Sequence, residues 1–398
     1  MRFWHLPLIF AAAGLIATSA LADDNEFELP TWSGAYQPQD RDERGLWAMD
    51  DESERALAQS DLVIRDTALN EYVRSVLCKT VGDDRCQSVR IYILRVPAFN
   101  ASMSPNGTMR VYSGLLLRVR SEAELASILG HEFAHFELRH TLRGFEAARR
   151  GSDAMAWTAL LGAVAASYGG TGPSVYDTQW SILGGLYSFK RDQERDADTL
   201  GFAYMANAGY RPSAAPEVWR SVMNESDQTA IDRGRRTKRY DGVAFFASHP
   251  TSLERADKLS ALANRVSGGE FDGFATHRKA MKDWVPLFLA DELAMNDFGG
   301  TDYVIDRLGG EEFTADLYYA KGELYRARGN PRDMVSAANF YQNALELDPE
   351  AASAWRGLGL ALLRSGKAED GRSALQNYLE RVPDAPDAPM LQMLVGEE

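Results

Sequence analysis

The sequence predicts a mainly α-helical protein that also contains a small β-sheet and ends in a separate helical domain. Apolar residues recur at helical spacing along most of the 398 residues, and only two short stretches, near 89–96 and 108–112, have the pattern of strands. The C-terminal part carries an internal repeat of about 34 residues. A chain of this length can bury two sizeable cores, so we expect two domains.

The first 22 residues have the pattern of a secretory signal. Arg2 precedes an apolar run over 6–17, and a small-residue site at 20–22 follows that run. We expect cleavage before Asp23 and export to the periplasm, and a retained N-terminal anchor is the alternative. No cysteine directly follows the run, which argues against a lipoprotein.

An arm, two helices and two strands are expected after the signal. Residues 23–44 are acidic, contain proline and show no period, which indicates an extended arm on the surface. Helices are expected at about 45–59 and 67–80, followed by the strands near 89–96 and 108–112. Alternation within the second strand suits a strand with one buried face.

The only two cysteines, Cys78 and Cys86, flank a short polar loop. In an oxidising compartment they could form a disulfide, which typically contributes about 2 kcal/mol or more through loop entropy. Two unpaired thiols are the alternative. Neither cysteine is placed like a nucleophile, so cysteine protease chemistry has no support.

The most informative motif is His-Glu-x-x-His, formed by His131, Glu132 and His135. On a helix, residues four apart share a face, so both imidazoles can bind one zinc ion while the carboxylate acts as a general base. The pattern therefore indicates a metal-dependent hydrolase.

The residues around this motif predict a helix. Ser121 followed by Glu124 is a capping box, and apolar residues then recur at helical spacing. Gly130 is unfavourable inside a helix, so its presence suggests that another backbone approaches closely there.

A catalytic zinc needs a third protein ligand. The metzincin pattern fails, because Leu138 and Thr141 stand where it requires Gly and His. A second helical pattern runs over about 181–208 and stops at Gly209. Its acidic residues form two pairs spaced four apart, Glu194 with Asp198 and Asp192 with Asp196. In either pair one carboxylate could bind the metal while the other orients a histidine ring, and spacing alone does not choose. A solvated charged stretch is the alternative.

Glu194 and Asp198, placed after His-Glu-x-x-His, resemble the E-x-x-x-D motif of gluzincin metallopeptidases of the HtpX, Oma and CAAX prenyl protease type. Two further stretches resemble motifs of that family. They are Asn100-Ala101-x-x-x-Pro105-x-Gly107, like its strand segment before the zinc helix, and His249-Pro250-x-x-x-x-Arg255. Four motifs in order over about 60–265 make the resemblance specific. Ser102 and Asn106 depart from it, since an aromatic and a glycine are common there.

The resemblance implies zinc held by His131, His135 and Glu194. Such a zinc lowers the pKa of a bound water and polarises the scissile carbonyl. Glu132 would accept the proton of the water and pass it to the leaving amine. The resulting reaction is hydrolysis of internal peptide bonds.

The same resemblance gives roles to the residues around the ligands. Asp198 and Arg255 would orient the site. His249 would either donate to the tetrahedral oxyanion or close the open coordination position. The strand at 108–112 would be the sheet edge beside the cleft, where an extended substrate could add as a further strand.

The rest of the chain indicates the branch of the family. The HtpX and prenyl-protease branches carry several membrane-spanning helices. Here the only other long apolar stretch, at about 154–168, is shorter than the roughly 20 residues that span a bilayer. We expect a core helix near the active site, with membrane contact as the alternative. The chain therefore resembles the soluble, periplasmic BepA-like branch.

The C-terminal repeat has the pattern of tetratricopeptide repeats. Pro349 and Pro383 are 34 residues apart, and small, aromatic and leucine anchors occur both between them and in the unit before Pro349. The anchors are Gly322, Tyr325, Tyr341 and Ala344 in one unit, and Trp355, Leu358, Gly359 and Leu375 in the next. Two such units cannot bury their apolar faces alone, so they should stack on a flanking segment, for which 276–298 is the candidate. An ordinary helical domain without a recognition function is the alternative.

The sequence divides accordingly. The expected parts are a signal peptide at 1–22, an arm at 23–44, a zinc metallopeptidase domain at 45–265, a helical linker at 266–313 and a repeat domain at 314–398. Glycine pairs at 268–269, 299–300 and 309–310 are expected to interrupt the linker.

Charge narrows the choice of partners. The chain carries a net charge of −14, and removing the signal with Arg2 brings it to −15. This acidity argues against binding to nucleic acid or to anionic lipid surfaces, so we expect protein partners.

The predicted function is zinc-dependent endoproteolysis of misfolded or stalled envelope (outer-membrane) proteins, with the repeats binding proteins such as outer-membrane assembly machinery. A periplasmic chaperone or adaptor with residual or no proteolysis is the alternative. An aminopeptidase has no support, because nothing marks a site for a free α-amine.

Overall fold

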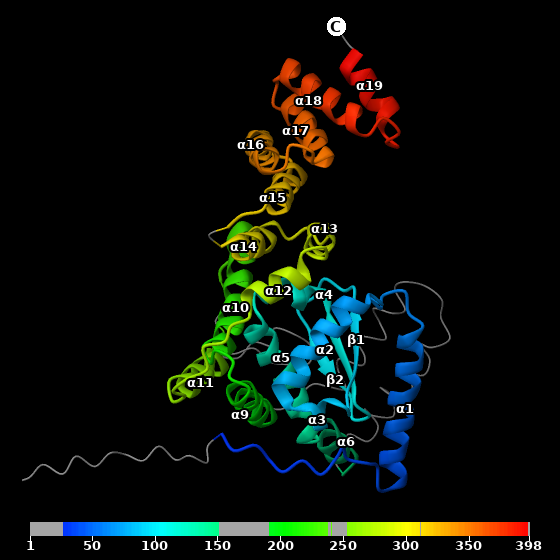
Figure 1. Cartoon of the computed structure of the whole chain (residues 1–398), viewed down its shortest axis with the longest axis vertical. Coiled ribbons are helices and arrows are strands. Elements are labelled where there is room, and N and C mark those ends of the chain that lie inside the picture. Colours follow the sequence, from blue (N-terminus) through cyan, green and yellow to red (C-terminus); the bar gives the residue numbers. More distant parts are fainter. Residues whose placement is uncertain (1–26, 151–190, 238–239, 241–252, 311, 397–398) are drawn as a thin grey trace, which may run out of the picture.

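The computed structural model of this chain describes residues 27–150, 191–237, 240, 253–310 and 312–396. Figure 1 shows an elongated molecule in which the N-terminal helices surround a small sheet and the C-terminal helices extend away from it. Both the mainly α-helical class and the small sheet are as predicted. The signal peptide (1–22), the apolar stretch at 154–168 and His249 lie outside the described residues.

In the first part of the fold two long helices, α5 (Glu122–Glu137) and α9 (Arg191–Asn207), pack against each other in the core. The helices of this part are α1 (Arg41–Ala58), α2 (Thr67–Val81), α3 (Asp83–Cys86), α4 (Ser113–Arg118), α5 (Glu122–Glu137), α6 (His140–Arg150), α9 (Arg191–Asn207), α10 (Ala214–Asp232) and α11 (Leu253–Ala263). Helix α1 begins four residues earlier than expected, because the Asp40 side chain accepts hydrogen bonds from two backbone N–H groups of the first turn. Helix α9 is followed, as expected, by Gly209, whose φ of 76° suits glycine.

The sheet has three strands in the order β1-β3-β2. They are β1 (Arg90–Leu94), β2 (Ala101–Met103) and β3 (Thr108–Tyr112). Strand β3 pairs in parallel with β1 and antiparallel with β2, so it is central. The expectation that this strand forms the sheet edge is therefore wrong. The edge on that side is β2, which apolar alternation did not predict but which lies in the segment at 100–107 that resembles a strand segment of the family.

Strand β3 is also buried on both faces, and not on one face as expected. Arg110 creates the misleading alternation. Its side chain is only 2% exposed, and it donates hydrogen bonds to the side chains of Ser104 and Ser53. A buried charge supplied with acceptors can occupy a core position, which a pattern of apolar and polar residues cannot reveal.

The cysteine pair closes a loop beside the core. Cys78 at the end of α2 and Cys86 in α3 form a disulfide, with their Cα atoms 4.9 Å apart. The structure thus contains the disulfide and not two unpaired thiols.

Three helices connect the sheet-containing part to the repeats: α12 (Phe274–Met281), α13 (Val285–Ala294) and α14 (Phe298–Gly309). We expected the glycines at 299 and 300 to interrupt the chain. They instead form part of the first turn of α14. A Cβ on Gly299 would lie 2.4 Å from the carbonyl oxygen of Gln228, so the glycine allows α14 to pack closely on α10.

The repeats are helix pairs, as the sequence predicts. The helices are α15 (Ala315–Arg328), α16 (Pro331–Leu347), α17 (Ala352–Arg364), α18 (Ala368–Arg381) and α19 (Ala388–Gly396). The ring of Tyr341 fills the space left by Gly322 and Gly357, where a Cβ would come within 2.5 Å of it. The first pair stacks on a flanking segment, since α13 and α14 both contact α15.

One core runs through the junction of the two parts. Leu317, Ala320 and Leu324 of α15 belong to the same buried cluster as Phe133 of α5. Among the described residues, no helix combines the length and the apolar character needed to cross a membrane.

Candidate metal centre

Helix α5 carries the His-Glu-x-x-His motif in the interior of the protein. Ser121 caps it as predicted, because its hydroxyl accepts a hydrogen bond from the backbone N–H of Glu124 at 3.2 Å. The side chains of His131, Glu132 and His135 are each at most 3% exposed. Their burial means that polar groups must satisfy one another or bind an ion.

A pair of glycines lets α9 cross α5 beside the motif. A Cβ on Gly201 would lie 2.7 Å from both the N and the Cα of His131, and a Cβ on Gly130 would lie 3.0 Å from the carbonyl oxygen of Gly201. The close approach expected at Gly130 is therefore present. The crossing places the start of α9, with Glu194, within reach of both histidines.

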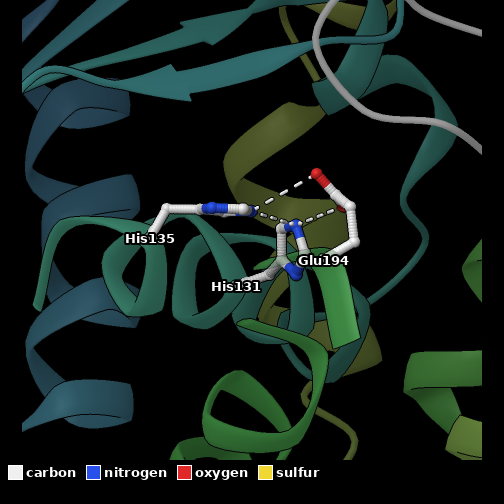
Figure 2. Close-up of side chains that lie close together, drawn as sticks. All are labelled: His131, His135 and Glu194. Carbon is white, nitrogen blue, oxygen red and sulfur yellow. Dashed lines mark hydrogen bonds and ion pairs between the residues drawn. The ribbon is translucent and has the colours of Figure 1, made fainter. Parts of the chain in front are cut away.

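Three polar side chains from these two helices converge. Figure 2 shows the imidazoles of His131 and His135 and the carboxylate of Glu194 pointing toward a common point. The two Nε2 atoms lie 3.1 Å apart, and the Glu194 oxygens lie 3.5 Å from His131 Nε2 and 3.6 Å from His135 Nε2. One ligand atom from each residue falls within 4.8 Å of the others.

The structure chooses between the two acidic pairs on α9. Glu194 and Asp198 are buried and face the histidines, whereas Asp192 and Asp196 are exposed. The difference arises because the crossing of α5 and α9 covers only one face of α9.

Asp198 and Arg255 contact His131 on different sides of its ring: Asp198 lies at Nδ1, and Arg255 Nη2 lies 3.3 Å from Nε2. Asp198 Oδ1 lies 3.1 Å from His131 Nδ1, and Arg255 of α11 donates to both oxygens of Asp198 at 2.6 and 2.8 Å. Arg255 Nη1 also contacts Glu194 Oε2 at 2.8 Å. The guanidinium thus fixes one oxygen of Glu194 while the other oxygen faces His135.

The charges of this group are set by burial and by mutual contacts. Burial opposes protonation of His131, but hydrogen bonds to Asp198 and Glu194 raise its pKa to about 9. Burial would raise the pKa of Asp198, yet the Arg255 guanidinium and His131 hold it below the ordinary value.

Two residues contact the metal-ligand group although no motif in the sequence marked them. No motif surrounds His140 in the sequence, but its Nδ1 lies 2.9 Å from His135 Nδ1. The chain reverses at Arg139, whose φ is 55°, and this turn between α5 and α6 brings His140 back onto His135. No spacing rule signals such a reversal.

Trp219 of α10 is the second missed residue. Its ring lies 4.3 Å from the Arg255 guanidinium carbon and 6.3 Å from the His131 ring. It forms an apolar wall over the arginine, and helical periodicity alone could only mark it as a core position.

The residues present fit a divalent metal such as zinc. Two imidazole nitrogens and a carboxylate oxygen are a common zinc ligand set that leaves a fourth position for water. Partners at both Nδ1 atoms, Asp198 for His131 and His140 for His135, leave the Nε2 atoms directed at the common point.

The fold and the site together define a metallopeptidase domain of the His-Glu-x-x-His type joined to tetratricopeptide repeats. Comparison with known families makes the assignment specific. The chain belongs to peptidase family M48, whose sequence profile matches residues 65–263, and a tetratricopeptide-repeat profile matches residues 325–396. The family resemblance expected from the motifs is thereby confirmed.

Several curated relatives carry protease names. A Vibrio cholerae protein provisionally named beta-barrel assembly-enhancing protease is 31% identical over 56% of this chain and 51% of its own length. The mitochondrial metalloendopeptidase OMA1 of Arabidopsis thaliana is 29% identical over 44% of this chain and 32% of its own. The beta-barrel assembly-enhancing protease of Yersinia pestis is 26% identical over 45% and 38%, respectively. The chain therefore spans about half or less of the length of these relatives.

Proposed function

We propose that this protein is a zinc-dependent metalloendopeptidase that cleaves misfolded or stalled envelope proteins. The observation that carries the proposal is the convergence of His131, His135 and Glu194, three buried ligand-type side chains, beside Glu132. Membership of peptidase family M48 supports the same chemistry.

The roles of the residues follow from their chemistry. His131, His135 and Glu194 would hold the metal, which would supply Lewis acidity to polarise the scissile carbonyl and activate a water molecule. Glu132, on the same helix as both histidines, would act as the general base that takes a proton from the attacking water and would pass it to the leaving amine. Asp198 and Arg255 keep His131 and Glu194 in position.

Substrate would bind as an extended strand along β2. This strand is the sheet edge on one side, and it packs against α5, the helix that carries the motif. Main-chain hydrogen bonds to an edge strand tolerate many sequences. Such a mode suits a protease that acts on unfolded segments of many proteins.

Envelope location is the second part of the proposal. The N-terminal signal pattern and the Cys78–Cys86 disulfide both suit an exported protein. The names of relatives refer to beta-barrel assembly, so outer-membrane proteins are the proposed substrates. The repeats, within the proposed domain at 314–398, would bind protein partners of that assembly, and no nucleic acid.

The alternative of a chaperone or adaptor without proteolysis is separated by one experiment. The mature chain from residue 23 is assayed for zinc content and for cleavage of casein, alongside Glu132→Gln and Glu194→Ala. Glu132→Gln should keep zinc and lose turnover by a factor of about 100 or more, because the proton acceptor is gone. Glu194→Ala should lose zinc affinity.

Two results would contradict the proposal. A mature chain that contains zinc and binds casein without cleaving it would favour the adaptor. Full zinc content and full activity in Glu194→Ala would show that the third ligand is misassigned.

His249 has two possible roles that a single variant separates. His249→Ala should raise basal proteolysis if the imidazole closes the fourth position. It should lower proteolysis about 100-fold or more if the imidazole stabilises the oxyanion.

A further inference from the structure

A cavity of about 640 Å³ is lined by none of the residues proposed to bind the metal or to act in catalysis. It is bounded by the end of α4, by α12 and the start of α13, and by the end of α14 and the start of α15. Its volume falls within the range of about 300–1,000 Å³ that is usual for small-molecule sites. The cavity thus joins helices of the peptidase part to the first helix of the repeats.

The wall of the cavity is mainly apolar. Leu116, Met281, Leu308 and Leu317 line it, and each comes from a different helix. An apolar ligand that fills this space would bury its surface against four helices at once, which favours binding.

Positive charge gathers around the apolar wall. Arg120, Arg278, Lys279 and Lys282 line the cavity, against two carboxylates, Glu312 and Asp316. Arg278 is already paired with Glu312 at 3.0 Å. The remaining three cations form a positive patch in a protein whose net charge is −14.

Arg120 is the cation best placed to bind a ligand. It is half-buried, and its Nε is buried without a hydrogen-bond acceptor among the described residues. Within the same described part of the chain, no ion pair joins Arg120, Lys279 or Lys282 to a carboxylate. A planar guanidinium binds a carboxylate with two parallel hydrogen bonds, so Arg120 suits a carboxylate ligand.

We propose that this cavity binds one medium- or long-chain fatty acid, with its acyl chain against the apolar wall and its carboxylate at Arg120. The inference goes beyond the proposed protease activity and does not depend on it. Lys279 and Lys282, both exposed at the cavity, add long-range attraction for the anion.

A fatty acid fits better than a peptide because the wall offers few main-chain partners. Most of the wall is helical, so its backbone groups are bonded within their own helices. The carbonyl of Val119, in the loop after α4, already accepts a hydrogen bond from His277 Nε2 at 3.0 Å. A buried peptide would leave its own N–H and C=O groups without partners, whereas an acyl chain has none to satisfy.

The test is isothermal titration calorimetry of the full mature chain with dodecanoate below its micelle concentration. Dodecanoate should bind at one site per chain. Dodecyltrimethylammonium, with the same tail and opposite charge, should bind at least about tenfold more weakly, and dodecyl maltoside likewise. Bound dodecanoate should also raise the melting temperature, since it contacts helices on both sides of the junction.

Variants locate the site. Arg120→Gln should weaken dodecanoate binding about tenfold, because one charged hydrogen-bond partner is lost. Lys279→Gln combined with Lys282→Gln should weaken it by a smaller factor that disappears at high salt. Ala315→Trp should abolish binding by filling the cavity, and Lys367→Gln, an exposed cation on the repeats, should change nothing.

The proposal fails if dodecanoate does not bind, or if Ala315→Trp and Arg120→Gln, folded by circular dichroism, bind it like the parent chain. Equal binding of the cationic and neutral amphiphiles would show a nonspecific apolar surface. Tighter binding of a lysophospholipid than of dodecanoate would assign the cavity to lipid headgroups instead. If dodecanoate does not bind and a peptide with an apolar C-terminus does, the ligand of the cavity is a peptide and not a fatty acid.

Discussion

The crossing of α5 and α9 predicts a sharp response to a single methyl group. In Gly201→Ala the new Cβ would lie 2.7 Å from backbone atoms of His131, whereas ordinary contact begins at 3.4 Å. Helix α9 must then move away from α5 by about 0.7 Å, the difference between these distances. Backbone atoms cannot rotate aside as a side chain can, so the helices themselves must separate.

A shift of this size matters because metal sites tolerate little displacement. Ligand distances hold to within about 0.2 Å, and a functional site as a whole to within about 0.5 Å. Moving α9 carries Glu194 away from His131 and His135, so we expect zinc affinity to fall at least about tenfold. Overpacking of this kind should also lower the free energy of unfolding by about 1–3 kcal/mol.

Zinc affinity is measured by competition with a chromophoric chelator, and stability by urea unfolding with and without EDTA. Gly144→Ala is the matched control, because Gly144 lies in helix α6 and a Cβ there meets nothing within 4 Å. That control should stabilise its helix by about 0.5–1 kcal/mol and leave zinc affinity unchanged. Gly130→Ala, with its nearest contact at 3.0 Å, should fall between the two. If Gly201→Ala bound zinc as tightly as Gly144→Ala, the crossing would not determine the ligand geometry.

Three further predictions concern His140 beside the metal site, the buried His277 and the disulfide. Burial lowers the pKa of His140 to about 4, so at pH 7 it can accept a hydrogen bond from His135 Nδ1. His140→Leu should therefore weaken zinc binding by about 10- to 100-fold in the chelator competition, and His140→Gln, which keeps an acceptor, by less; equal affinities would exclude the orienting role. Burial also lowers the pKa of His277 from 6.5 to about 4, so the unfolded chain binds its proton first as the pH falls. The stability from neutral His277 is complete above pH 6.5 and is lost toward pH 4, with a loss of about 2 kcal/mol at pH 5. Urea unfolding at pH 7 and pH 5 should show this loss reduced in His277→Gln, and identical pH dependence would contradict it. Alkylation of the unfolded, non-reduced chain should find no free thiol at Cys78 or Cys86, and labelling of both would exclude the disulfide.

Local patterns were enough to predict the parts of the site that lie on one helix. The capping box at Ser121 and the four-residue spacing of His131 and His135 specify a helix with both imidazoles on one face, and the structure has this arrangement. The repeats were predictable for the same reason. Helical periodicity and the anchor glycines act between residues that are close in sequence.

The sheet shows where local patterns stop. Strand β3 was predicted at the right residues, but its central place depends on pairing with β1 on one side and β2 on the other. Arg110 looked like a solvent-facing residue, but hydrogen bonds to Ser53 and Ser104, which belong to other segments, help to make its burial possible. Strand order and burial are properties of such distant contacts.

The sequence by itself determined the motif, the helix that carries it, the family and the succession of helices. Spacing left two acidic pairs open, and the family resemblance pointed to Glu194. The tertiary structure supplies the physical reason, because only the face of α9 that carries Glu194, and not Asp192, is covered at the Gly130–Gly201 crossing. The turn at Arg139 decided that His140 contacts His135. Spacing specifies which residues share a face, but the neighbour that the face meets is set by packing between segments that are far apart in the chain.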